Sequence, residues 1–136
     1  MIGNTGNNTI TGGTGKDTLT GGLGIDRFDY RNLADSVLSS FDVITDFNAT
    51  ANNDLFLVST ARSVFSNVGS VATLDTTGIA AKLTNTAFVA NSAAQFTFGT
   101  GASIRSFVAI NDGTAGFSAT TDAIIEVTGV DRKSTR

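Results

Sequence analysis

Near the start of the chain, one large apolar residue recurs every nine positions within a polar, glycine-rich background. Ile10, Leu19 and Phe28 each stand eighth in a unit that has glycine at its first and fourth positions and Asn or Asp at its sixth. Turn-forming residues fill most of the first six positions, so each unit predicts a turn followed by a short strand. Because a strand this short cannot bury its apolar side chain alone, we expect two units to form one coil of a flattened parallel helix, with stacked coils sharing a core.

The same period continues into residues 30–38, where Asp35 takes the sixth position although the turn glycines are missing. We therefore predict a degenerate fourth unit. Since one coil takes two units, units two apart in sequence are expected to be neighbours in space. Asn8 should then face Asp26 on one side of the stack, and Asp17 should face Asp35 on the other.

Stacked turns of this kind direct backbone carbonyls and the sixth-position carboxylates into the gap between coils. Hard oxygen ligands around a small cavity favour Ca²⁺, which takes about six to eight of them. The unit also resembles the G-G-x-G-x-D-x-U-x repeat of RTX (hemolysin-type) proteins, which binds calcium. The predicted calcium ligands, through side chains or backbone carbonyls, are Asn4, Gly6, Asn8, Gly13, Gly15, Asp17, Gly21, Leu23, Asp26 and Asp35.

Two alternatives compete with a calcium-binding repeat. The first is a glycine-rich linker, which three units in register disfavour because such regularity is rare by chance. The second is a phosphate-cradling loop, suggested by Gly15 and Lys16. Such a loop needs Ser or Thr after the lysine, and Asp17 stands there instead.

The stretch 41–58 predicts a strand, a polar turn and a second, fully apolar strand over 55–58. Its Asp-x-Ile-x-Asp-Phe run resembles the segment that closes the repeat region in serralysin-type secreted proteases. The resemblance implies that Asp42, Asp46 and Asp54 are further calcium or capping residues. Ordinary N-cap and turn aspartates are an equally good interpretation.

The rest of the chain predicts two short helices and three strands. Segments rich in Ala, Ser and Thr, with apolar residues at helical spacing, give helices within 60–72 and 77–88, and the second is best defined over 77–86. Apolar or alternating runs give strands at the segments 95–98, 106–110 and 123–128.

A turn signal, Asn111-Asp112-Gly113, ends the middle of these three strands. Together with Asp122, Asn111 and Asp112 flank a glycine-containing loop, and these side chains could hold an ion. A plain β-turn is the favoured interpretation.

Four stretches of the C-terminal half carry a second resemblance. They read Leu-Thr-Asn-Thr-Ala-Phe-Val-Ala-Asn from residue 83, Phe-Thr-Phe-Gly from 96, Phe-Val-Ala-Ile-Asn-Asp-Gly-Thr-Ala-Gly-Phe from 107 and Asp-Ala-Ile-Ile-Glu-Val-Thr-Gly from 122. On these stretches, residues 41–130 resemble the bluetail domain, found at the C-termini of predicted surface proteins of cyanobacteria. The resemblance implies a cell-surface setting.

The chain is thus expected to be mainly β. We predict a short parallel β-roll of nonapeptide repeats over 3–38, followed by a small β-rich α+β region over 39–130. Residues 131–136, Asp-Arg-Lys-Ser-Thr-Arg, break the weakly charged pattern before them, and we expect them to be a non-native tail.

Composition narrows the functional classes. The 136 residues include no His and no Cys, which removes the usual general base, His-dependent nucleophile pairs, common zinc sites and disulfides. The formal net charge is −3 and no apolar stretch approaches the length of a membrane span, so neither a nucleic-acid surface nor a membrane helix is expected. We expect no enzymatic activity.

The leading functional expectation is a noncatalytic calcium-binding module of a secreted or cell-surface protein. By resemblance to RTX proteins, the repeats would stay unfolded in the cytoplasm, pass a type I exporter and fold on meeting extracellular calcium. Calcium ions, the type I secretion machinery and cell-surface components are the expected partners. The alternative is a structural or adhesive surface module that binds another protein or a glycan.

Overall fold

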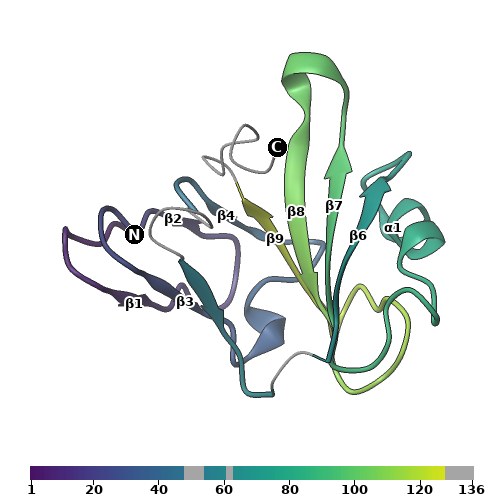
Figure 1. Ribbon diagram of the computed structural model, residues 1–136, viewed down its shortest axis with the longest axis horizontal. Coiled ribbons are helices and arrows are strands. Elements are labelled where there is room, and N and C mark those ends of the chain that lie inside the picture. The colour runs from purple at the N-terminus through teal and green to yellow at the C-terminus, as the bar shows by residue number, and fades with distance from the viewer. Residues whose placement is uncertain (48–53, 61–62, 128–136) are drawn as a thin grey trace.

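The computed structural model describes residues 1–47, 54–60 and 63–127. Within them the protein is mainly β, as predicted, with two sheets and one short α-helix (Figure 1). The segment 131–136 lies outside the described residues, as does most of the polar turn predicted before Asp54. None of the helices in the described part of the chain has the length and apolar character of a membrane span.

The nonapeptide units alternate between the two sheets. Strands β1 (Thr9–Ile10), β3 (Arg27–Asp29) and β5 (Leu55–Leu57) form a parallel three-stranded sheet in that order. Strand β2 (Thr18–Leu19) lies in the second sheet, parallel to β4 (Asp42–Ile44). This alternation is what the period of nine predicts, because a turn separates each short strand from the next.

The apolar residues at the eighth positions form columns across these strands. Ile10 is paired in register with Phe28, and Phe28 with Phe56, while Leu19 is paired with Ile44. Ile10, Leu19, Phe28 and Ile44 are at most 4% exposed. Burial of these side chains fixes the register, because a one-residue slip would turn each of them to the solvent side.

The predicted fourth unit is wrong. Leu33–Asp35 is a 3₁₀ helix, called η1, in which the Asn32 side chain accepts a hydrogen bond from Ala34 N–H. The strand beside β2 is β4, not the segment around Val37. Residues 30–38 have no glycine to take the positive φ of about 86–90° that Gly13, Gly15, Gly22 and Gly24 adopt in the true repeats.

The second sheet continues into the C-terminal part of the chain, in the order β2-β4-β9-β8-β7-β6, with β6 (Phe65–Ser70) at its edge. Three strands match the predicted ones, namely β7 (Ala93–Phe98), β8 (Arg105–Ile110), which is preceded by the 3₁₀ helix η2 (Gly101–Ser103), and β9 (Ala123–Val127). They form antiparallel ladders, and β9 pairs in parallel with β4. One sheet therefore runs from the repeats through the C-terminal strands (Figure 1).

The helix predicted within 60–72 is wrong, because that region contains strand β6 (Phe65–Ser70). Its backbone pairs in parallel with β7, with a register shift between Asn67 and Ser70 where Gly69 has a φ of 82°. The helix predicted over 77–86 is confirmed in shorter form as α1 (Thr76–Lys82). Asp75 caps it by accepting a hydrogen bond from Gly78 N–H at 2.7 Å.

Two apolar clusters fill the interior. The first joins eighth-position residues of the repeats, such as Phe28, to inward-facing residues of β8 and β9, such as Ile110 and Ile125. The second lies between α1 and the other face of the same strands, and includes Ile79 and Phe107. Strand β9 is buried on both faces, so the repeats and the C-terminal strands share one core.

Candidate metal centre

Side-chain carboxylates link each coil to its neighbour through the sixth positions. Asp26 Oδ1 accepts a hydrogen bond from Asn8 N–H at 2.9 Å. Asp54 Oδ1 accepts from Asp26 N–H at 2.9 Å, and Asp42 Oδ1 accepts from Asp17 N–H at 2.8 Å. The result is one column through Asn8, Asp26 and Asp54, and a second through Asp17 and Asp42.

The pairing predicted between Asn8 and Asp26 is thus present, whereas the pairing of Asp17 with Asp35 is wrong. Asp42 takes the place expected for Asp35, because β4 and not residues 30–38 continues the stack. Asp35 lies in η1, where its Oδ1 accepts from the Asn32 amide at 3.2 Å. Burial raises the pKa of Asp35, and the negative charges of Asp29 and Asp17 raise it further.

The first-position glycines make room for these side chains. A Cβ built on Gly12 would lie 2.7 Å from Asp17 Oδ2, and one on Gly21 would overlap Asp26 Oδ2. A Cβ built on Gly3 would likewise overlap Asn8 Oδ1. Each sixth-position side chain therefore folds back over the glycine that opens its own unit, which explains why glycine recurs there.

The turns of units one and three stack closely. A Cβ on Gly22 would lie 2.6 Å from the Asn4 carbonyl oxygen, and one on Gly24 would lie 2.7 Å from the Gly6 carbonyl oxygen. The Asn4 and Gly6 carbonyls, both predicted as ligands, thus lie in the gap between two turns. Leu23, at the tip of the second of these turns, is 65% exposed, so only its backbone is suited to binding.

Two carboxylate oxygens in the repeats are buried without a hydrogen-bond partner, Asp17 Oδ2 and Asp26 Oδ2. Burial raises the pKa of Asp26, as do the nearby carboxylates of Asp54 and Asp46. A buried carboxylate oxygen without a partner is costly, and a bound cation would remove this cost. The donor set of carboxylates and backbone carbonyls has the hard-oxygen chemistry that calcium requires.

Comparison with known protein families agrees with this geometry. Residues 1–28 match the family model described as RTX calcium-binding nonapeptide repeat (4 copies). These residues are RTX repeats. Neither the curated proteins nor the solved structures contain a match to the chain. The RTX repeats imply calcium binding for the N-terminal part.

Carboxylates alone do not complete a metal site. Within residues 1–47, 54–60 and 63–127, no three acidic, His or Cys side chains converge closely enough to hold an ion. Backbone carbonyls from the turn positions would have to supply the remaining ligands, among them the predicted Gly13, Gly15 and Gly21. Positive φ at Gly13 and Gly15 sets the orientation of these turn carbonyls.

Asp46 closes the turn of the third RTX repeat. Its Oδ1 accepts from Gly21 N–H at 2.8 Å and its Oδ2 from Gly22 N–H at 2.7 Å. Both oxygens thus cap backbone donors, and the charge lies near the buried Asp26. The structure thereby gives Asp46 the capping role that was one of its two predicted roles.

Asp42 is fully buried on the other side of the stack. Its Oδ2 accepts from the Tyr30 hydroxyl at 2.8 Å. Burial raises the pKa of Asp42 to about 6, even though hydrogen bonds from Asp17 N–H and Tyr30 lower it, and the carboxylates of Asp17 and Asp35 raise it further. Burial raises the pKa of Tyr30, and the negative charge of Asp42 and the hydrogen bond to Asp42 raise it further.

Sequence reasoning missed the position of Asp42 and Asp54 in the stack. Each stands two residues before an inward-facing apolar residue of a stacked strand, Ile44 or Phe56, just as Asp26 stands two before Phe28. The triplet Asp-x-apolar was the available signal. It was hidden because the spacing from the last RTX repeat is not a multiple of nine.

The acidic residues of the C-terminal loop form a braced turn. Asp122 Oδ1 accepts from Asp112 N–H at 3.0 Å and Asp122 Oδ2 from Ser118 N–H at 2.7 Å. Asp112 Oδ1 accepts from Thr114 N–H at 2.9 Å, and the Asn111 amide donates to the Phe88 carbonyl at 3.0 Å. These contacts support the favoured turn interpretation.

Proposed function

We propose that this chain is a noncatalytic calcium-binding module of a secreted or cell-surface protein. Its N-terminal part would be a short β-roll that folds when it meets extracellular calcium. The observation that carries the proposal is the pair of buried, unpartnered oxygens, Asp17 Oδ2 and Asp26 Oδ2, within RTX repeats.

The carboxylates of the two columns explain why the folded repeats need a cation. Asp26, Asp42 and Asp54 are all at most 4% exposed, and burial of charge without compensation is unfavourable. Calcium, when bound, supplies the positive charge that offsets the burial of these carboxylates and the repulsion between them. Asp17 and Asp26 direct a carboxylate oxygen into the site, Asp42 and Asp54 hold the backbone of the preceding unit, and the turn glycines leave room for both.

Calcium binding and folding of the repeats are thermodynamically linked. A ligand that binds only the folded form stabilises it by RT ln(1 + [Ca²⁺]/Kd), about 2.7 kcal/mol when free calcium is about 100 times Kd. Extracellular calcium modules have Kd values of about 10⁻⁴ to 10⁻³ M, so such repeats stay unfolded at cytoplasmic calcium levels. Glycine-rich repeats lose much conformational entropy on folding, which adds to this dependence.

The proposed cellular setting is extracellular. RTX repeats are typical of secreted proteins, which supports an extracellular location and passage through a type I exporter. The resemblance of the C-terminal half to the bluetail domain supports attachment to the cell surface, as in cyanobacterial proteins.

Thermal unfolding of the full chain, followed by circular dichroism, tests the proposal. Calcium is expected to raise both the β-sheet signal and the melting temperature relative to a chelator. Equimolar magnesium should do neither, because Mg²⁺ demands a tight octahedron and retains its waters. Superimposable melting curves with calcium and with chelator would contradict the proposal.

A further inference from the structure

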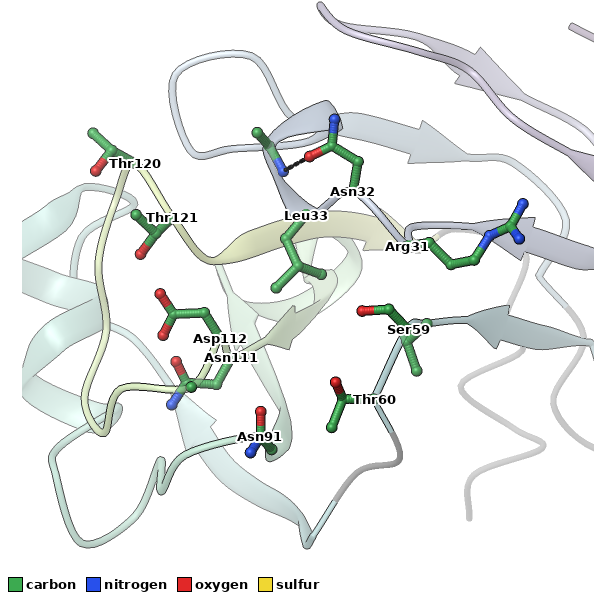
Figure 2. A pocket seen from close by; sticks show the side chains of 13 residues that line it. Arg31, Asn32, Leu33, Ser59, Thr60, Asn91, Asn111, Asp112, Thr120 and Thr121 are labelled. Atoms are coloured by element: carbon green, nitrogen blue, oxygen red, sulfur yellow. Dashed lines mark hydrogen bonds between the residues drawn. The ribbon is translucent and has the colours of Figure 1, made fainter.

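A cavity of about 420 Å³ opens where the repeats meet the C-terminal loops. One wall comes from the segments that follow β3 and β5, and the other from the loops that follow β8 and precede β9. Figure 2 shows Leu33, Ser59 and Thr60 on one side, facing Asn91, Asp112 and Thr121 on the other. The volume lies within the range of about 300–1,000 Å³ that is usual for small-ligand sites.

The side chains that line this cavity are mainly neutral hydrogen-bonding groups. Ser59, Thr60 and Thr121 bring hydroxyls, Asn91 brings an amide, and Leu33 adds an apolar surface. A neutral polyhydroxylated ligand would find both donors and acceptors here, together with an apolar surface for its C–H groups.

Charge argues against an anionic ligand. The one basic side chain of the lining, Arg31, is bound at 2.9 Å by Asp29, which lies outside the cavity. The one acidic side chain, Asp112, repels anions and accepts hydrogen bonds from hydroxyls. A single carboxylate is also too few for a calcium cage, which requires several charged or carbonyl oxygens.

The wall from the C-terminal loops is held rigidly. Asn91 has a φ of 58° and is the one non-glycine residue with positive φ in the described part of the chain. Its N–H donates to the Asp112 carbonyl at 2.8 Å, and its own carbonyl accepts from Ser63 N–H at 2.8 Å. Asp112 N–H is in turn held by the buried Asp122 carboxylate. Such pre-organisation reduces the entropy lost on binding.

We propose that this cavity binds a neutral saccharide of one or two rings. The Asp112 carboxylate and the hydroxyls of Ser59, Thr60 and Thr121 engage the sugar hydroxyls, and Leu33 contacts a ring face. This binding is separate from the calcium function, since the cavity contains none of the carboxylates in the two columns.

Saturation-transfer difference NMR on the calcium-loaded full chain tests the proposal. The probes are glucose, galactose, mannose, N-acetylglucosamine, lactose and cellobiose, with inorganic phosphate as the anionic comparison in a parallel calorimetric titration. At least one saccharide is expected to bind, and phosphate is not. Binding of phosphate instead, or of no saccharide in the panel, would overturn the proposal.

Two variants locate the binding. Gly113 lines the cavity, and a Cβ built on it meets no atom within 4 Å, so Gly113→Phe should fill the cavity and abolish saccharide binding. Ser103→Phe, an exposed substitution at the opposite end of β8, is the matched control. The milder Thr121→Val keeps the shape and removes one hydroxyl, and should weaken binding several-fold. Calcium titrations should be unchanged in all three, and saccharide binding that survives both cavity variants would overturn the assignment.

Discussion

The repeat coils and the C-terminal sheet use strands in opposite ways. Strands β1, β2 and β3 are two or three residues long, and each buries one large apolar side chain. Between them run hydrogen bonds from backbone N–H groups to buried carboxylates. Strands β7, β8 and β9 are five or six residues long and form continuous antiparallel ladders with aromatic residues packed on one face.

The difference indicates what stabilises each region. The C-terminal sheet gains its stability from apolar burial, whereas the coils bury carboxylates, which is unfavourable without compensating positive charge. The two meet at Ser36, which is fully buried. Its Oγ accepts from Asp42 N–H at 2.8 Å and donates to the Ile124 carbonyl at 2.5 Å, so the hydroxyl links the start of β4, which stacks on β2 of the coils, directly to β9.

The largest effect is expected from the core of the C-terminal sheet. Phe107 is fully buried and stacks on Phe96 with ring centroids 5.1 Å apart. Phe107→Ala should lower the free energy of unfolding by about 3–5 kcal/mol, in calcium and in chelator alike. Phe65→Ala, at a position 61% exposed on β6, is the control and should change it by less than about 0.5 kcal/mol. Denaturant unfolding measures both, and a Phe107 effect confined to the calcium-loaded form would break the distinction between the regions.

A second test compares a glycine of the coils, Gly21, with a glycine of the C-terminal sheet, Gly69. Gly21→Ala places a Cβ against Asp26 Oδ2 and should lower calcium affinity by roughly tenfold or more, about 1.4 kcal/mol. Gly69→Ala, in β6, meets no atom within 4 Å, so it carries only the strain of its φ of 82° and should cost about 1 kcal/mol of stability without changing calcium affinity. Calorimetric calcium titration separates the two. Equal calcium affinities would show that the Asp26 carboxylate is not part of the site.

A third test probes the connection between the regions. Ser36→Ala removes both bonds of the hydroxyl and leaves the buried Asp42 N–H unsatisfied, at a cost of about 1–3 kcal/mol. We expect lower stability and weaker calcium binding together, because the hydroxyl joins a coil to β9. Ser39→Ala, at an exposed position nearby, is the control. A loss of stability with unchanged calcium affinity would mean that the two regions are not coupled through Ser36.

The smallest effect concerns pH and the C-terminal loop. Burial raises the pKa of Asp122 from 3.8 to about 6, against hydrogen bonds from Ser118 and Asp112 N–H. Its contribution to stability is therefore fully present below pH 3.8 and is lost as pH rises through about 6. In chelator, the free energy of unfolding of Asp122→Asn, measured relative to that of the unsubstituted protein, should rise as the pH increases from 3.8 to about 6. A stability difference that stays constant across this pH range would show that the pKa of Asp122 is not raised.

The period of nine was enough to predict how the first three units alternate between sheets. The same regularity led to the wrong fourth unit, because Asp35 keeps the spacing while the chain forms η1 instead. Asp42 and Asp54 lie in the stack because β4 pairs with β2 and β5 pairs with β3. These pairings join segments that are far apart in sequence. Spacing alone does not contain that information.

In the C-terminal half, local patterns identified β7, β8, β9 and α1 but not β6. Val64 and Val68 are four residues apart, as on one face of a helix, yet this edge strand forms because β7 offers it backbone partners. The parallel pairing of β4 with β9 likewise joins segments about 80 residues apart, a contact that no local pattern predicts.

The central claim is that the carboxylate column of the RTX repeats, Asn8 and Asp26, continues into Asp54, whose charge lies near Asp26 and adds to the attraction for calcium. The most direct measurement is calorimetric calcium titration of Asp26→Asn, Asp54→Asn and the double variant, with Asp29→Asn as control. Asparagine keeps an oxygen to accept the backbone N–H, so the change removes mainly charge. The account predicts that each single substitution lowers affinity by about tenfold, that the double is little worse, and that Asp29→Asn has no effect. An Asp54→Asn variant that binds calcium as tightly as the control would contradict it.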